Sequence, residues 1–321
     1  MTDTDDFRPY LTRLRDALAG AEAGDDAAAL ACLGLAGLGD GLPIIRPTDT
    51  RVAAMLQGRN PAAPAGVGLL PISFNQPNFG ELAAAAVLAG CSVGALPLIA
   101  AALDATADPA FNLLGVQTTT GAAAPLVIVH GPAVATFGLN PGANALGSGF
   151  RANLTIGRAV RLVLADVGLC RPGEGDMATH GHPGKISWLV AENQPVSPWE
   201  PLSTLLGAEP CAGGVTVFAG VGNVEVVLPT TTAKALIARL AQVLAGLAAP
   251  AGVLLLPPES AQFLHRHGVG RHDLAGELEA SGVGSPLTVV TGGTGIKATV
   301  IPGWGGPTEP VTRWLQDWLD E

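Results

Sequence analysis

Charged and aromatic side chains are scarce in this chain of 321 residues. Asp, Glu, Lys and Arg make up 14% of the residues and aromatic residues 4%, whereas 48% are hydrophobic. This composition excludes a disordered chain and predicts helices and strands that pack closely through small side chains. The net charge is -10 and no basic stripe with interleaved aromatic residues occurs, so nucleic acid is not an expected partner.

Cysteines are also few and widely separated. The four cysteines form no CxxC motif, which excludes a zinc ribbon and a thioredoxin-type redox motif: Cys32, Cys91, Cys170 and Cys211. The start of the chain, Met1–Asp6, is acidic where a secretory signal would be basic and then apolar. We therefore expect a cytoplasmic protein with reduced thiols.

A stretch without charged residues, Leu82–Leu103, is long enough to cross a bilayer. Alanine and glycine supply most of it, and its interior contains Gly90–Ser92 and Pro97. Such an interior favours two helices that meet at a break over one membrane span. No membrane partner is therefore expected.

The length and the order of apolar segments predict an α/β protein. A chain this long exceeds one hydrophobic core, so we expect two α/β lobes, residues 1–205 and residues 206–321, in a homo-oligomer. Strands alternate with helices in the second half, which is typical of largely parallel sheets covered on both sides. We expect strands at 111–116, 125–130, 215–218, 224–228, 253–256 and 287–291, and helices within 7–38, 49–56, 82–103, 153–165, 232–247, 259–278 and 310–319.

Two apolar segments, Ala124–Pro132 and Ser285–Gly293, align at an offset of 161 residues. A duplicated α/β unit would produce this pattern, and so would two unrelated buried strands that each end in a glycine turn. Ligands of open α/β folds bind beyond the carboxyl ends of strands, which would place His130 and Gly292 at such an edge.

Reactive side chains concentrate in Gly175–Trp188, which holds two of the six histidines and one of the three lysines. His180 and His182 are two residues apart, so an extended backbone would point both imidazoles to one side, as a pair of metal ligands requires. Alternatively, both imidazoles hydrogen-bond loop carbonyls. Zinc or iron would need a third ligand, for which the nearby candidates are Asp176, Glu174 and Cys170.

Lys185, Glu192 and Cys91 join His180 and His182 as candidate catalytic residues. Partial burial would lower the pKa of Lys185 toward a value useful for a base or a Schiff base, although the amine could equally bind a carboxylate. Glu192 ends an apolar run and could act as acid or base. Cys91 lies between two helical segments, where amides could stabilise a thiolate; the alternative is a small buried apolar residue.

Two glycine-rich segments are candidate anion sites. Residues 138–151 precede an expected helix whose free amides would bind a carboxylate or phosphate, unless the glycines merely serve a turn. Residues 292–297 follow an expected strand and again combine glycines with a cation, but they lack the order of a P-loop. The candidate substrate-binding residues are Asn144, Gly147, Gly149, Arg151, Gly293 and Lys297.

An ordered set of motifs spans nearly the whole chain: AGC at Ala89–Cys91, APLVIVHGP, NPGANALGSGFRANLTIGRAVRL, GDMATHGHPGKISW, AENQPVSPWEPL and GGTGIKATVIPG. In these motifs the chain resembles a poorly characterised bacterial family whose members are often encoded beside a small protein with a UGSC or CGSC thiol/selenol motif. The resemblance implies a two-component enzyme in which the partner supplies a reactive thiol or selenol. This sequence has no such motif of its own, which leaves the role of Cys91 open.

Together these features predict an enzyme or enzyme subunit that acts on a small anionic metabolite. Residues 142–151 would hold the anion, while His180, His182, Lys185 and Glu192 would transfer protons or activate a carbonyl. Thiol-dependent redox or lyase chemistry with a small partner protein is the favoured class. The alternatives are a metal-dependent hydrolase that uses His180 and His182, and a non-catalytic scaffold subunit.

Overall fold

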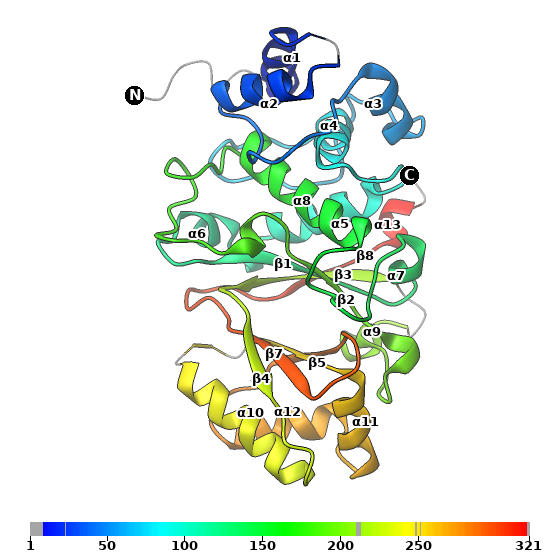
Figure 1. Ribbon diagram of the computed structural model, residues 1–321, viewed down its shortest axis with the longest axis vertical. Coiled ribbons are helices and arrows are strands. Elements are labelled where there is room, and N and C mark those ends of the chain that lie inside the picture. Colours follow the sequence, from blue (N-terminus) through cyan, green and yellow to red (C-terminus); the bar gives the residue numbers. More distant parts are fainter. Residues whose placement is uncertain (1–8, 23, 210–212, 248, 251, 320–321) are drawn as a thin grey trace.

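The computed structural model describes residues 9–22, 24–209, 213–247, 249–250 and 252–319 (Figure 1). The helices of four or more residues are α1 (Tyr10–Ala19), α2 (Asp26–Leu35), α3 (Asp49–Leu56), α4 (Phe79–Ala89), α5 (Leu96–Ala107), α6 (Leu113–Thr118), α7 (Ala133–Thr136), α8 (Arg151–Leu162), α9 (Leu202–Leu205), α10 (Ala233–Leu247), α11 (Pro258–Arg266), α12 (Arg271–Ala280) and α13 (Gln316–Leu319), and a π-helical segment, Val163–Val167, continues α8. The strands are β1 (Ala124–His130), β2 (Leu189–Ala191), β3 (Gly214–Gly220), β4 (Val224–Val227), β5 (Val253–Leu256), β6 (Leu287–Val290), β7 (Lys297–Ile301) and β8 (Val311–Trp314).

The strands form two four-stranded sheets, with the orders β2-β1-β3-β8 and β4-β7-β5-β6. In the first sheet, β1 is parallel to β2 and antiparallel to β3, and β3 is antiparallel to β8. In the second, β5 is parallel to β6 and antiparallel to β7, and β7 is antiparallel to β4. The α/β class is confirmed, but both sheets are mixed, so the prediction of largely parallel sheets is wrong.

The aligned segments Ala124–Pro132 and Ser285–Gly293 occupy different places in the two sheets. β1 lies inside the first sheet, between β2 and β3, whereas β6 is the edge strand of the second sheet. An internal duplication along this alignment is therefore not supported.

Sheet membership does not follow the predicted lobes 1–205 and 206–321. Strands β3 and β8 come from residues 206–321, but they belong to the first sheet together with β1 and β2.

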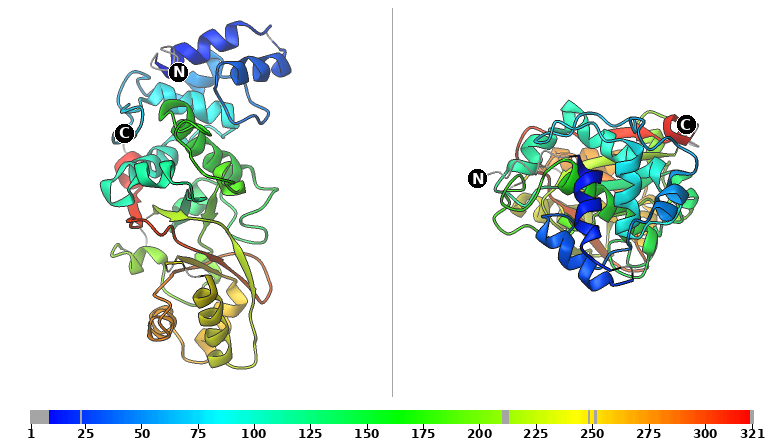
Figure 2. Two further views of the ribbon diagram at one scale, coloured as in Figure 1. Left: turned by 90° about the vertical axis from the view of Figure 1, so that its left-hand side faces the viewer. Right: turned by 90° about the horizontal axis from the view of Figure 1, so that it is seen from above.

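The molecule has four layers, which follow one another along its long axis (Figure 2). They are a helical layer that includes α4, α5 and α8, the first sheet, the second sheet, and a helical layer of α10, α11 and α12. Alternate side chains of a strand point to opposite faces of its sheet. The side chains of β1 therefore pack against the helices on one face and against the second sheet on the other. Val127 and Val129 belong to the core shared with α4, α5 and α8, while Leu126 and Ile128 pack between the sheets with Leu255 of β5. Helices α10, α11 and α12 cover the outer face of the second sheet.

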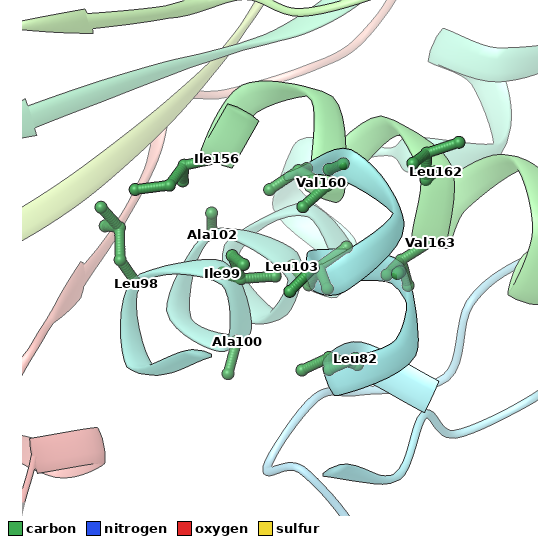
Figure 3. Packing of buried hydrophobic residues seen from close by; sticks show 14 of the residues in the cluster. Leu82, Leu98, Ile99, Ala100, Ala102, Leu103, Ile156, Val160, Leu162 and Val163 are labelled. Atoms are coloured by element: carbon green, nitrogen blue, oxygen red, sulfur yellow. The ribbon is translucent and has the colours of Figure 1, made fainter. Parts of the chain in front are cut away.

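Helices α4, α5 and α8 pack against one another beside the first sheet, and Figure 3 shows Leu82, Leu103 and Val160 among these helices. Every residue of α4 is buried, which is why this helix reads as apolar on all sides. The predicted break is confirmed, because α4 ends at Gly90 with φ of 86° and α5 begins at Leu96. Among the described residues, no helix combines the length and hydropathy that crossing a membrane requires.

Local signals also place other elements correctly. The Thr48 side chain accepts a hydrogen bond from the Arg51 amide and caps α3, which ends at Leu56 as expected. The strands expected at 125–130, 215–218, 224–228, 253–256 and 287–291 correspond to β1, β3, β4, β5 and β6.

The single helix expected at 259–278 is two helices, α11 and α12. Two further segments differ from the prediction in the type of element. The strand expected at 111–116 is a 3₁₀ turn, Pro109–Phe111, followed by α6, because Asn112 adopts φ of 53° and its side chain accepts from the Gly115 amide as a helix cap. The helix expected at 310–319 begins as strand β8, which adds to the edge of the first sheet, and only its end is helical. Here the pairing of β8 with β3 outweighs the helical preference of the local sequence.

Candidate functional site

The two glycine-rich segments meet at one pocket of about 600 Å³. Asn144 and Gly147 line it from the first segment, and Gly293 and Lys297 line it from the second. We call this site the glycine-loop pocket and define it by residues 144–147 and 291–297. Its volume suits a small metabolite.

Direct contacts hold the two segments together. The Gly292 amide donates to the Pro141 carbonyl oxygen at 2.9 Å. The Thr291 hydroxyl lies 2.7 Å from the Ala191 carbonyl oxygen and 3.1 Å from that of Pro141. A side chain on Gly293 would place its Cβ 2.8 Å from the Cβ of Ala143, so glycine is needed for this close approach.

The pocket lies beyond the carboxyl ends of β5 and β6, because Leu255, Pro257 and Thr291 also line it. The end of β2 meets the same place, since the Asn193 amide donates to the Val290 carbonyl oxygen at 2.8 Å. The predicted position of Gly292 at a strand edge is thus confirmed. His130 does end β1, but it is fully buried and its Nε2 lies 3.1 Å from the Thr216 hydroxyl oxygen.

The charged residues of the pocket are Lys297 and Glu225. Their side chains form an ion pair of 2.6 Å across β7 and β4, and both remain more than half exposed, at 56% and 62%. An exposed pair of this kind contributes little to stability, so Lys297 can turn toward an anion at small cost. The Gly295 amide already donates to Glu259 Oε2 at 2.9 Å.

Two other members of the predicted anion site are placed differently. Arg151 is the first residue of α8, and its Nε donates to the Gly90 carbonyl oxygen at 2.8 Å, beside the end of α4. Arg151 is not among the residues that line the glycine-loop pocket. Gly149 adopts φ of 105°, so it serves the turn before α8.

The predicted catalytic segment lies at the other end of the β1–β2 pair. Pro183–Lys185 precedes β2, and the Thr179 amide donates to the Thr120 carbonyl oxygen, ahead of β1. The glycine-loop pocket lies at the carboxyl ends of the strands. The structure therefore does not bring His180, His182 and Lys185 together with the two glycine-rich segments.

Lys185 is bound by a carboxylate, one of the two roles expected for it. Its Nζ lies 2.8 Å from both carboxylate oxygens of Asp176. Arg161 supports the pair, because its Nη2 lies 3.6 Å from Asp176 Oδ2 and its Nε donates to the Lys185 carbonyl oxygen. Burial lowers the pKa of Lys185, in the predicted direction, and Asp176 opposes that shift.

His180 and His182 lie in different environments. His180 is exposed, whereas His182 Nδ1 accepts from the Gly184 amide at 3.1 Å and its ring meets Trp188 edge-on at 4.6 Å between centroids. Burial, followed by the charge of Lys185, lowers the pKa of His182. No group of three His, Cys, Asp or Glu side chains suited to a metal ion occurs in the part of the chain that the structure describes. The third ligand predicted, Asp176, is held by Lys185 instead.

Glu192 is buried in an ion pair and does not line the glycine-loop pocket. Its side chain is 0% exposed, lies 3.2 Å from Arg271 Nη2 and accepts from the Leu202 amide at 2.9 Å. Burial raises the pKa of this carboxyl group, and the charge of Arg271 opposes the rise. A structural role follows most directly from these contacts.

The predicted nucleophile Cys91 is a buried thiol. Its Sγ donates to the Thr155 carbonyl oxygen at 3.2 Å, and burial raises its pKa to about 12. The hydrogen bond of the sulfur goes to a carbonyl group of α8, whereas helix α5, whose amides were expected to stabilise a thiolate, begins only at Leu96. Cys170 is also buried, with a pKa of about 11, and Cys211 lies outside the described residues.

Sequence reasoning missed Arg161 and Thr291. Arg161 lies inside α8 among apolar residues, a setting that could have indicated a buried charge with a carboxylate partner. Thr291 follows the apolar run of β6 directly, where a hydroxyl between a strand and a glycine turn indicates a contact to another segment. Both signals were available in the sequence, but neither specified its partner.

Comparisons of the chain with protein-family models, with curated proteins and with solved structures find no match. The resemblance to the poorly characterised bacterial family, and the two-component enzyme that it implies, stay predictions.

Proposed function

We propose that this chain is an enzyme or enzyme subunit that binds a small anionic metabolite in the glycine-loop pocket. One observation carries the proposal: two glycine-rich segments about 150 residues apart line a single pocket at the carboxyl ends of strands. Such edges are where α/β proteins bind their ligands, and glycines allow a phosphate or carboxylate to approach the backbone closely. Lys297 supplies the positive charge.

The reaction class follows from the family resemblance rather than from the pocket. Redox or lyase chemistry would use a thiol or selenol of a small partner protein, while this chain holds the substrate. Cys91 and Cys170, which are buried and have raised pKa values, are poor nucleophiles at neutral pH. Co-expression with a UGSC or CGSC protein encoded beside the gene should give one species in size-exclusion chromatography. Separate elution of the two proteins would contradict the two-component arrangement.

Calorimetric titration with inorganic phosphate and with malonate tests the anion site. We expect binding by the native chain and a roughly tenfold weaker affinity in Lys297→Gln, which removes the cation. Gly293→Ala should weaken binding by a similar factor, because its Cβ forces the two segments apart. Lys234→Gln and Gly246→Ala are matched controls on α10, where Lys234 is exposed and a Cβ at Gly246 meets nothing within 4 Å. Binding that is absent, or equal in all four variants, would overturn the proposal.

A further inference from the structure

A second cavity, of about 340 Å³, lies at the N-terminal end of the molecule. Its walls come from α1, the loop before α4, the start of α4 and the segment after the π-helical turn Val163–Val167. We call it the N-terminal cavity; the residues that matter here are Tyr10, Arg13, Phe74, Asn75, Glu81 and Leu169. None of these residues lines the glycine-loop pocket.

Backbone strain gathers around this cavity. Among the described residues, six that are not glycine have positive φ. Asn112 and Asn144 are asparagines, which tolerate this conformation, and Gln57 is the left-handed C-cap of α3. The other three are apolar: Ile72 at 78°, Phe74 at 52° and Leu169 at 59°. Such conformations are strained, and strain of this kind concentrates at ligand clamps and active sites.

The three strained residues belong to one structure. Phe74 and Leu169 line the N-terminal cavity. Ile72 packs nearby, because a Cβ on Gly175 would lie 2.8 Å from both Ile72 Cδ1 and the Leu169 carbonyl oxygen. The π-helical turn before Leu169 is a further irregularity, of a kind that is frequent at functional sites. Two loops from distant parts of the chain are thus held in strained conformations around the same space.

The polar groups of the cavity favour a ligand that donates hydrogen bonds and carries positive charge. Glu81 is 4% exposed, and its carboxylate accepts only from neutral groups among the described residues, the Asn78 amide at 3.0 Å and Asn75 Nδ2 at 3.4 Å. Tyr10 is 2% exposed, and its hydroxyl has no hydrogen-bond partner in the described part of the chain. A buried hydroxyl without a partner destabilises the fold, and a ligand that bonds to it would recover that loss.

The other charges near the cavity are already engaged with the protein. Arg13 Nη2 donates to the Asp166 carbonyl oxygen at 2.6 Å, and the Asp166 carboxylate accepts from the Gly39 amide at 3.0 Å. Burial raises the pKa of Glu81, and the hydrogen bonds from Asn78 and Asn75, followed by the charge of Arg13, oppose the rise only in part. A cation beside Glu81 would stabilise its ionised form. The ring of Phe74, which is 76% exposed, can cover the apolar part of such a ligand.

We propose that the N-terminal cavity is a second ligand site, which binds a small alkylammonium compound with its ammonium group on Glu81 and Tyr10 and its hydrocarbon part under Phe74. The site is independent of the anion site and takes a ligand of opposite charge.

Saturation-transfer NMR and calorimetry with three probes of equal length, butylammonium, butan-1-ol and butyrate, test this site. We expect butylammonium to bind at least roughly tenfold more tightly than the other two, and Glu81→Gln to remove that preference. Tyr10→Phe and Phe74→Ala should weaken butylammonium binding a few-fold, while phosphate binding at the glycine-loop pocket stays unchanged.

Equal binding of the three probes, tighter binding of butyrate, or no binding of butylammonium would overturn the proposal. So would an unchanged affinity in Glu81→Gln. Thermal unfolding of each variant shows whether it is folded. If Glu81→Gln fails to fold, Phe74→Ala decides, because its side chain is largely exposed and its removal leaves the core intact; an unchanged affinity in that variant would also count against the site.

Discussion

Lys185 and Asp176 form a bidentate ion pair, in which one ammonium nitrogen lies 2.8 Å from both carboxylate oxygens. Both side chains are mostly buried, at 14% and 9% exposure, and Arg161 lies beside them. The pair ties the turn after Cys170 to the segment that enters β2. The segment Gly175–Trp188, in which reactive side chains concentrate, therefore has a structural role that the free energy of unfolding can measure.

Replacing Lys185 by Met should lower the free energy of unfolding by about 3 kcal/mol, because Asp176 then keeps a buried charge without its closest partner. Urea denaturation measures this change. The exposed Lys234→Met on α10 is the matched control and should stay within about 0.5 kcal/mol of the native chain. Unchanged stability in Lys185→Met would show that the ion pair is not structural and would leave the amine free for chemistry.

The buried ion pair of Arg271 and Glu192 should contribute more to the free energy of unfolding than the exposed pair of Lys297 and Glu225. Arg271→Met leaves Glu192 buried and charged, so we expect a loss of about 3–5 kcal/mol in unfolding free energy. Lys297→Met should cost at most about 1 kcal/mol, since that pair is solvated. Adding Glu192→Gln to Arg271→Met should restore much of the loss, and equal effects of the two single variants would contradict the assigned burial.

The buried imidazole of His130 should lower the free energy of unfolding in acid. Burial lowers its pKa to about 4, from an unfolded value near 6.5, so the folded protein holds this imidazole neutral. The stability that His130 contributes is fully present above pH 6.5 and is lost as the pH falls from 6.5 through 4. His130→Gln removes this component, so the difference in unfolding free energy between the native chain and the variant should change by a few kcal/mol across that window. A constant difference from pH 7 to pH 4 would contradict the lowered pKa.

Cys91 and Cys170 should resist alkylation in the folded protein. Their pKa values of about 12 and 11 leave few thiolates at pH 8, so iodoacetamide should react at least roughly a hundredfold more slowly than with a free cysteine. Variants that keep a single cysteine, followed by mass spectrometry, resolve each site. Cys32 is only partly buried and serves as the faster reference. Rapid modification of Cys91 before unfolding would restore it as a candidate nucleophile.

Local patterns in the sequence were sufficient for most elements and for the existence of the two glycine-rich segments. The cap at Thr48, the glycine break after α4 and the apolar run of β5 depend on contacts between near neighbours in the chain, which a sequence displays directly. The candidate substrate-binding residues Asn144, Gly147, Gly293 and Lys297 were found in the same way, and all four line one pocket.

Only the tertiary structure decided how the strands pair and which reactive groups meet. A strand such as β1 is apolar on both faces whether helices or a second sheet cover it, so its sequence predicted burial but suggested parallel sheets wrongly. The separation of Lys185 from the glycine-loop pocket likewise depends on which end of β2 each segment occupies. The sequence by itself determined most of the helices, most of the buried strands and the glycine turns, because these follow from neighbouring residues. Pairing, layer order and the shared pocket depend on contacts between residues far apart in the chain, and those form only when the whole core is packed.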